Sequence, residues 1–411
     1  MAVLTKHPAS APPEAPPRET TGHLLLRGWC VFVLFSALAG TGWVLAIGSV
    51  GAGVLAAAAT LLSVVFWLVL HPPLQWRRLP WVALAFVLWA AVPVIWSPNP
   101  ANAAVVWMLL TAASINAMFI AAALTWRDVV RSIASAVKWV IGLSVAFEVA
   151  VAIFVGGPIL PGFVIAPAGG DSAAYWSSGD FFGDGPLEGI VGDPGVLGAL
   201  MVLAIIVFVI RFAARAPRRP VLLVWIVVAG FILVRSGSTV SLLAVAGVTL
   251  VLATVLLMRT ATHPGERTRY YLLYATAGIA GGAVVWISFG DSLGSAQGAW
   301  AQVFDHLGPI GVVLLAMALL AFIWRAWFFA VDRPRFDLVA DRPYSPLALL
   351  PTLLATLLLV EGVAEPGVLL LWGWMLLVLL GAKIKQAPLV GVGPAEQSLA
   401  IERGEAPRAA A

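Results

Sequence analysis

The sequence predicts an all-α, polytopic membrane protein of about twelve transmembrane helices. Of its 411 residues, 61% are hydrophobic and only 11% are charged. Apolar runs of about 20 residues recur along the chain, and each is long enough to cross a hydrocarbon core of roughly 30 Å. A soluble chain could not cover so much apolar surface with so few charges. Charge also predicts orientation, because all of the 24 Lys and Arg residues except Arg235 fall on one side of the span pattern.

Charge and cysteine content exclude several other classes. The net charge is +4 and the isoelectric point is about 9.5, but the basic residues stand in short loops beside the spans. There they indicate topology and contact with anionic membrane lipids, not binding of nucleic acid. The one cysteine, Cys30, excludes an intramolecular disulfide. The histidines do not approach metal-ligand spacing and no phosphate-binding Gly-Lys-Ser/Thr loop is present, so we expect no cofactor.

The predicted elements follow in order along the chain. Residues 1–22 carry prolines among small and charged residues and are expected to form a disordered cytoplasmic tail. Residues 23–386 form the predicted transmembrane bundle, and residues 387–411 form a second cytoplasmic tail. Twelve spans put both termini on the same side, and a cytoplasmic N-terminus puts every basic loop inside. The spans are expected near residues 27–48, 51–70, 80–96, 102–125, 133–155, 189–212, 219–234, 239–258, 270–288, 300–326, 346–361 and 367–382.

The longest predicted outer loop, residues 156–188, has a distinctive composition. Its first half is rich in glycine and proline, which prevent a continuous helix, and its second half carries Tyr175, Trp176, Phe181 and Phe182. These rings either rest at the membrane interface or, with Trp176 as the strongest candidate, stack on a sugar ring.

Arg235 is the first candidate site residue, because it is the one cation predicted on the outer side. It begins the segment Arg235-Ser236-Gly237-Ser238-Thr239 between two spans. An arginine can bind a phosphate with two parallel hydrogen bonds, and Ser236, Ser238 and Thr239 would add donors. In the alternative interpretation, the arginine reaches the outer interface and pairs with Glu361 or Asp305.

Acidic side chains form the rest of the candidate site. Glu148 lies inside the fifth predicted span, where a carboxylate is costly unless it is paired, hydrated or protonated. Glu361 and Glu365 are one helical turn apart at the end of the eleventh span. They could act as a base and a positioning group, or they could only keep the helix end hydrated. We expect these two carboxylates and Arg235 to converge in one outward cavity.

A further polar pair is predicted at the start of the tenth span. Asp305 and His306 stand there, within two turns of its first residue. The histidine could carry a proton, and the alternative is an ordinary polar helix start.

Three segments together resemble a known family. They are Gly185-Pro186-Leu187-Glu188-Gly189-Ile190-Val191-Gly192-Asp193-Pro194 after the outer loop, the Arg235–Thr239 turn, and Ala299-Trp300 followed by Leu307-Gly308-Pro309-Ile310-Gly311. Over about residues 150–385 the chain resembles the O-antigen ligase and polymerase-like family. The resemblance implies a protein of the bacterial plasma membrane that assembles exopolysaccharide from polyprenyl-diphosphate-linked saccharide on the outer face.

The chain departs from that family at two places. Gln297-Gly298 stands where a His-Asn pair is expected, and Glu365-Pro366-Gly367 stands where Glu-Ser-Arg is expected. Few cations are left for a diphosphate, so either a divalent cation bridges Glu361 and Glu365 to the substrate or the chain is catalytically degenerate and works with a paralogous ligase or polymerase. A transporter or transport-complex permease for a lipid-linked or hydrophobic substrate is the alternative, with Glu148 and Arg235 in its pathway.

Overall fold

A computed structural model of the chain describes residues 21–72, 79–165, 175–260, 264–295, 298–331, 345–365 and 369–386. Residues 1–20 of the predicted N-terminal tail and the whole predicted C-terminal tail lie outside the described residues. Gln297, which stands where the family that the chain resembles has the histidine of a His-Asn pair, also lies outside the described residues.

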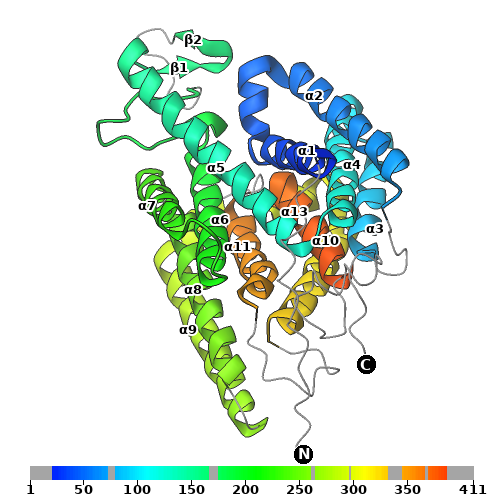
Figure 1. The fold of residues 1–411 in the computed structure, drawn as a ribbon, viewed down its shortest axis with the longest axis vertical. Helices are drawn as coiled ribbons and strands as arrows, with labels where there is room; N and C mark the ends of the chain where they lie inside the picture. The colour runs from blue at the N-terminus through cyan, green and yellow to red at the C-terminus, as the bar shows by residue number, and fades with distance from the viewer. Residues whose placement is uncertain are drawn as a thin grey trace, which may run out of the picture.

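The described part of the chain is almost entirely helical (Figure 1). Two two-residue strands, β1 (Ile159–Leu160) and β2 (Val164–Ile165), form an antiparallel pair in the loop after α5. The helices are α1 (Thr21–Leu38), α2 (Gly40–Leu70), α3 (Trp81–Ala91), α4 (Pro100–Ala123), α5 (Trp126–Ala150), α6 (Pro194–Ala213), α7 (Arg219–Arg235), α8 (Thr239–Thr260), α9 (Pro264–Ser295), α10 (Ala299–Val331), α11 (Leu350–Ala364) and α13 (Trp374–Gln386).

Among the described residues, seven helices are long and apolar enough to cross a membrane. They cover Gly40–Leu70, Pro100–Ala123, Trp126–Val155, Pro194–Ala213, Thr239–Thr260, Ala299–Val331 and Pro346–Ala364. These helices confirm the predicted class, a helical multi-pass membrane protein. Twelve spans are not confirmed, because apolar helices such as Gly22–Leu38 and Trp81–Ile95 are shorter than a full span.

Glycines set two of the helix breaks. The predicted boundary between the first two spans coincides with Gly48, whose backbone angles (φ 75°, ψ 167°) are not helical, and α2 bends sharply there (Figure 1). The chain also breaks once earlier, at Ala39, between α1 and α2. Gly308 (φ 68°) interrupts α10 directly before Pro309, which has no N–H to continue the helical hydrogen bonds.

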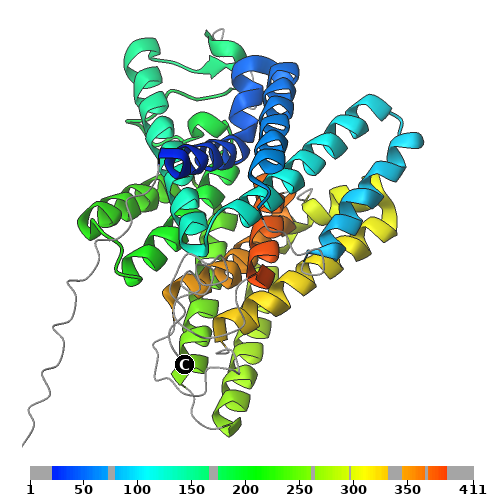
Figure 2. The same ribbon diagram turned by 45° about the vertical axis from the view of Figure 1, so that its right-hand side comes forward.

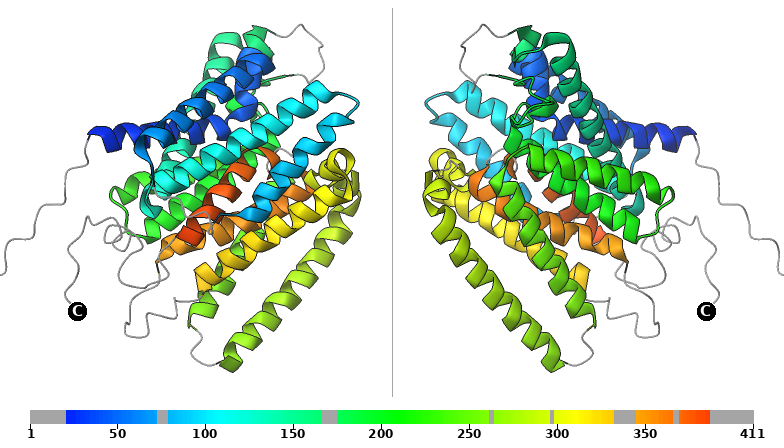
Figure 3. Two further views of the ribbon diagram at one scale, coloured as in Figure 1. Left: turned by 90° about the vertical axis from the view of Figure 1, so that its right-hand side faces the viewer. Right: turned by 90° about the vertical axis from the view of Figure 1, so that its left-hand side faces the viewer.

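The helix α6 lies at the centre and is the most buried of the seven spans. It packs against α5, α7, α8 and α11. A second group forms beside it, in which α3 packs against α10 and α4 packs against α13 (Figure 2). The antiparallel pair α8 and α9 extends along the outside of the bundle (Figure 3), where most described side chains of α9 are exposed.

Contacts between helix termini define two ends of the bundle. At the end that we call the basic end, the ammonium of Lys383 in α13 donates hydrogen bonds to the carbonyls of Ala121 (3.0 Å) and Leu124 (2.6 Å), where α4 ends. Arg259, in the last turn of α8, donates to the carbonyl of Ala330 (2.8 Å) near the end of α10. These cations compensate carbonyls that a helix C-terminus leaves without partners.

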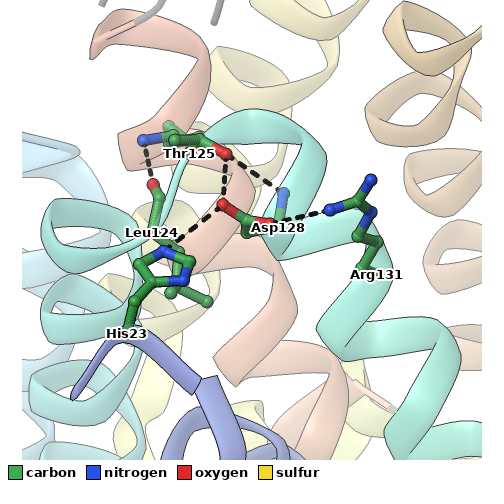
Figure 4. A network of polar contacts seen from close by, with 6 residues as sticks. His23, Leu124, Thr125, Asp128 and Arg131 are labelled. Atoms are coloured by element: carbon green, nitrogen blue, oxygen red, sulfur yellow. Dashed lines mark hydrogen bonds and ion pairs between the residues drawn. The ribbon is translucent and has the colours of Figure 1, made fainter. Parts of the chain in front are cut away.

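The start of α5 joins the basic end through a polar network (Figure 4). Thr125 caps the helix by accepting a hydrogen bond from the Asp128 N–H (3.2 Å), and its hydroxyl donates to Asp128 Oδ2 (2.6 Å). The same carboxylate pairs with Arg131 (3.5 Å) and lies 3.8 Å from His23 Nε2 of α1. The network fixes α1 against α5 where both helices begin.

The opposite end, which we call the acidic end, carries the described residues of the α5–α6 loop (156–165 and 175–193), the turn between α7 and α8, and the end of α11. The start of α10 reaches it too, since a Cβ on Gly298 would lie only 1.8 Å from the carbonyl oxygen of Val363. Arg235 lies at this end, whereas Lys383 and Arg259 lie at the basic end.

Candidate functional site

The candidate site is built around the first turn of α6. Asp193 caps this helix by accepting a hydrogen bond from the Val196 N–H (2.9 Å), and Pro194 occupies the first helical position. Gly195 and Gly198 follow on one helical face. A Cβ on Gly195 would lie 2.7 Å from Glu365 Oε1, and one on Gly198 would lie 2.6 Å from Ser241 Oγ. The two glycines therefore let polar side chains of α8 and α11 touch the backbone of α6.

Glu361 lies behind this glycine face and is completely buried. Its Oε1 accepts a hydrogen bond of 2.8 Å from the Ser241 hydroxyl, and its Oε2 has no hydrogen-bond partner among the described residues. Ser241 in turn accepts a hydrogen bond of 3.0 Å from the hydroxyl of Ser238, which also caps α8. A chain of hydroxyls thus leads from the half-buried Ser238 to the buried carboxylate.

Asp193, Glu361 and Glu365 together form what we call the carboxylate cluster. Glu365 ends α11, and its N–H donates a hydrogen bond of 2.7 Å to the Glu361 carbonyl. Burial raises the pKa of the Glu365 carboxyl above its ordinary value, and the negative charge of Asp193 raises it further. The partial positive charge of the α6 N-terminus acts in the opposite direction on nearby carboxylates. Within the described ranges, no group of three or more His, Cys, Asp or Glu side chains has an arrangement that could hold a metal ion.

Arg235 makes its contacts with the α5–α6 loop. Its guanidinium donates hydrogen bonds to the backbone carbonyls of Asp180 (3.1 Å), Gly183 and Gly185 (3.0 Å). Its own carbonyl accepts a hydrogen bond from the Leu187 N–H (3.1 Å). No ion pair joins this arginine to a carboxylate among the residues that the structure describes, so the pairings with Glu361 and Asp305 suggested by the sequence do not form.

Glu148 binds another stretch of the same loop. This carboxylate is 2% exposed and accepts hydrogen bonds from the Ser177 hydroxyl (2.7 Å) and from the N–H groups of Glu188 (3.2 Å) and Gly189 (2.6 Å). Three donors compensate the loss of water around a carboxylate at this depth. Glu148 therefore holds the loop on α5, as Arg235 holds it on α7.

Trp176 lies inside this loop and is almost completely buried, with 3% of its surface exposed. Its indole N–H donates to the Ile190 carbonyl (3.1 Å), and its ring packs against Phe147 and Phe163 at centroid distances of 4.9 and 4.7 Å. The most exposed aromatic side chains among the described residues of this loop are those of Phe182 (75%) and Phe163 (61%).

The other predicted site residues take separate positions. Ser236 is buried and donates a hydrogen bond to the Leu233 carbonyl (2.8 Å), while Thr239 is exposed at the start of α8. Asp305 and His306 are exposed on α10, just before the break at Gly308, and no contact with the carboxylate cluster is found for them in the described part of the chain.

Sequence reasoning missed the residues that bring the cluster together. Ser241 and the glycine face of α6 are not among the predicted site residues, and Asp193 appears in the sequence analysis only as part of a family segment. Two local signals were available. The run Asp193-Pro194-Gly195 is typical of a helix start followed by close packing, and Ser238 stands three residues before Ser241, the spacing of a helix cap.

Comparison of the chain with protein-family models, curated proteins and solved structures finds no match. The functional assignment therefore depends on the residues and on the geometry of the acidic end.

Proposed function

We propose that this chain is a divergent O-antigen ligase/polymerase-like protein of the bacterial plasma membrane. In this proposal its acidic end faces outward and binds the sugar part of a polyprenyl-diphosphate-linked saccharide. The chain alone does not carry out glycosyl transfer, and it works with a paralogous ligase or polymerase in exopolysaccharide assembly.

Support comes first from the three segments that carry the family resemblance, because all of them contribute to the acidic end. The 185–194 segment contacts Arg235 through the carbonyl of Gly185 (3.0 Å) and the N–H of Leu187 (3.1 Å). The third segment begins next to Gly298, which packs against the end of α11 close to the carboxylate cluster. Segments far apart in the sequence that meet around buried polar groups are typical of a functional site.

The observation that carries the proposal is the set of hydrogen bonds that the Arg235 guanidinium makes. Stabilising a diphosphate leaving group, with about two negative charges, requires cations or a metal. The guanidinium of Arg235 is bound to three loop carbonyls instead. Carboxylates such as Glu365 suit the other part of such a substrate, because they accept hydrogen bonds from sugar hydroxyls. This supports binding of the saccharide without transfer.

A transporter or permease remains the second candidate, and the depth of the acidic side chains argues against it. Carriers place ionisable groups near the membrane midplane. Glu361 lies one turn from the end of α11, and Glu148 lies in the last turn of α5, both at the acidic end.

The test uses the purified full-length chain in proteoliposomes with lipid-linked oligosaccharide, with and without Mg²⁺. We expect binding that is weakened in Glu365→Gln and unchanged in the control Asp184→Asn, which changes an exposed acid of the α5–α6 loop. Sugar transfer should require an added intact ligase or polymerase. Transfer by the chain alone would overturn the non-catalytic assignment. Absence of saccharide binding would overturn the whole proposal. Uptake of the saccharide into the vesicle lumen would support the transporter.

A further inference from the structure

Lys138 is a cation inside a membrane-spanning helix, and it does not belong to the acidic end. It lies in the first half of the span Trp126–Val155, and its side chain is half-buried. The helices α5, α6 and α7 lie beside one another in this part of the bundle (Figure 1). Its ammonium lies 5.8 Å from the ring centroid of Phe208 in α6 and 5.7 Å from that of Trp225 in α7. A charged group within a span is costly and usually marks a functional position.

Two arginines extend this positive charge toward the basic end. Arg211 lies in the last turn of α6, Arg218 directly precedes α7, and both act electrostatically on Lys138. We call Lys138, Arg211 and Arg218 the basic triad. No hydrogen bond or ion pair joins the side chain of any of the three to another described residue. The carboxylate of Asp128, at the start of α5, is bound by Arg131 and accepts a hydrogen bond from Thr125.

Three like charges gathered at the end of a helix bundle destabilise it unless an anion lies between them. The two aromatic rings offset part of this cost for Lys138, because the face of an aromatic ring attracts a cation. They cannot neutralise its charge. The triad therefore lacks a counter-anion among the described residues.

The surroundings of the triad indicate where such an anion comes from. Trp225 approaches α5 at Gly142, where a Cβ would lie 3.9 Å from the ring. Around this contact, Trp139, Val209 and Val221 are 60%, 39% and 45% exposed and present apolar surface of the kind that faces acyl chains. A ligand that satisfies both the cations and this apolar rim carries a phosphate and hydrocarbon chains.

We propose that the basic triad binds the phosphate of an anionic phospholipid from the leaflet at the basic end, with its acyl chains along Trp139 and Val209. A basic pocket between helices on this side of a membrane protein is a common form of lipid recognition. This site is separate from the saccharide site, at the opposite end of the bundle, and does not depend on it.

The experiment incubates the purified full-length chain with phosphatidylglycerol or phosphatidylcholine in mixed micelles and counts retained lipids by native mass spectrometry. We expect the wild type to retain phosphatidylglycerol and the Lys138→Met and Arg211→Gln variants to bind it more weakly, each by roughly fivefold, since one basic side chain near a membrane surface contributes on that order. Lys138→Arg should restore retention.

Arg325→Gln is the matched control, because Arg325 is an exposed basic residue on α10, outside the triad. Retention in the double variant Lys138→Met/Arg211→Gln that equals the wild type would overturn the proposal, provided that both elute as the same species in size exclusion. A thermal-stability arm with inorganic phosphate separates the two sources of the anion. A full stabilising shift by phosphate alone would identify a free-phosphate site and exclude the lipid.

Discussion

Ser241 and Glu361, 120 positions apart in the sequence, are joined by a buried hydrogen bond of 2.8 Å from hydroxyl to carboxylate. Ser241 lies against Gly198 of α6, and its contact with Glu361 connects the start of α8 to the end of α11. The geometry of the carboxylate cluster depends on it.

Ser241→Ala should destabilise the protein. It removes the donor to Glu361 Oε1 and leaves a buried carboxylate without a described donor on either oxygen, at a cost of about 1–3 kcal/mol. Thermal unfolding in detergent would measure the effect. Thr249→Ala, which removes an exposed hydroxyl bonded within the same helix, is the control and should cause almost no change. Equal shifts in both variants would contradict a special role for the Ser241 contact.

Glu148→Ala should release the α5–α6 loop. The substitution removes the acceptor for the Ser177 hydroxyl and for the N–H groups of Glu188 and Gly189, and losing such a buried acceptor costs about 3 kcal/mol or more. We expect the loop to be cleaved faster in limited proteolysis. Asp184→Ala, an exposed acid in the same loop, should be cleaved at the wild-type rate, and an unchanged rate for Glu148→Ala would show that the loop is held without it.

Gly198→Ala and Gly230→Ala should change stability in opposite directions. A Cβ on Gly198 would lie 2.6 Å from Ser241 Oγ, and such overpacking costs about 1–3 kcal/mol. Gly230, inside α7, has open space around its Cβ position, so alanine there should stabilise the helix by about 0.5–1 kcal/mol. The midpoints of thermal unfolding of the two variants provide the comparison. Stabilisation by Gly198→Ala would refute the close contact between α6 and α8.

Glu365 should make stability depend on pH. Because burial and Asp193 raise the pKa of this carboxyl in the folded protein above its ordinary value of 4.5, the folded state binds its proton more tightly than the unfolded state does. The contribution of Glu365 is therefore fully present below about pH 4.5 and is lost as pH rises through its folded pKa. Glu365→Gln should remove this dependence and be more stable than the wild type at neutral pH. A steeper loss of stability with rising pH in the variant would reverse the assigned direction.

Cysteine labelling can test whether the acidic end and the basic end lie on opposite sides of the membrane. The single native cysteine is completely buried, which keeps the background low. A cysteine placed at Asp184, in the acidic-end loop, should react with an impermeant thiol reagent in intact cells, whereas one at Arg215, at the basic end, should react only after permeabilisation. Labelling of both positions from the same side would exclude the predicted topology.

The fold could be predicted from the sequence where local patterns control it. Apolar runs indicate helices, and Gly48 stands where the predicted first and second spans separate. The fifth span is predicted near residues 133–155, whereas its helix begins at Trp126, because Thr125 caps the helix and its hydroxyl donates a hydrogen bond to Asp128. A polar first turn looks like a loop when only hydropathy is considered.

The candidate site was harder to predict, because its contacts join distant parts of the chain. No local sequence pattern connects Glu361 with Ser241. Likewise, no local pattern shows that the N–H groups of Arg235 donate to loop carbonyls. Lys138 is not recognised as a candidate from the sequence, because one charge among so many hydrophobic residues hardly changes the mean hydropathy of its span. Each of these positions is determined by helix packing, and packing is specified by the whole sequence.

The anchoring of the α5–α6 loop has a consequence for how the chain is made. Glu148 is synthesised before the loop, but Arg235 follows Gly185 by 50 residues, two helices later. The nascent loop can bind only its first anchor at first, because the second becomes available only after α6 and α7 have been synthesised. The second anchor of the loop thus forms late in biogenesis, and truncation of the chain before residue 235 should leave a loop that proteases cleave more readily.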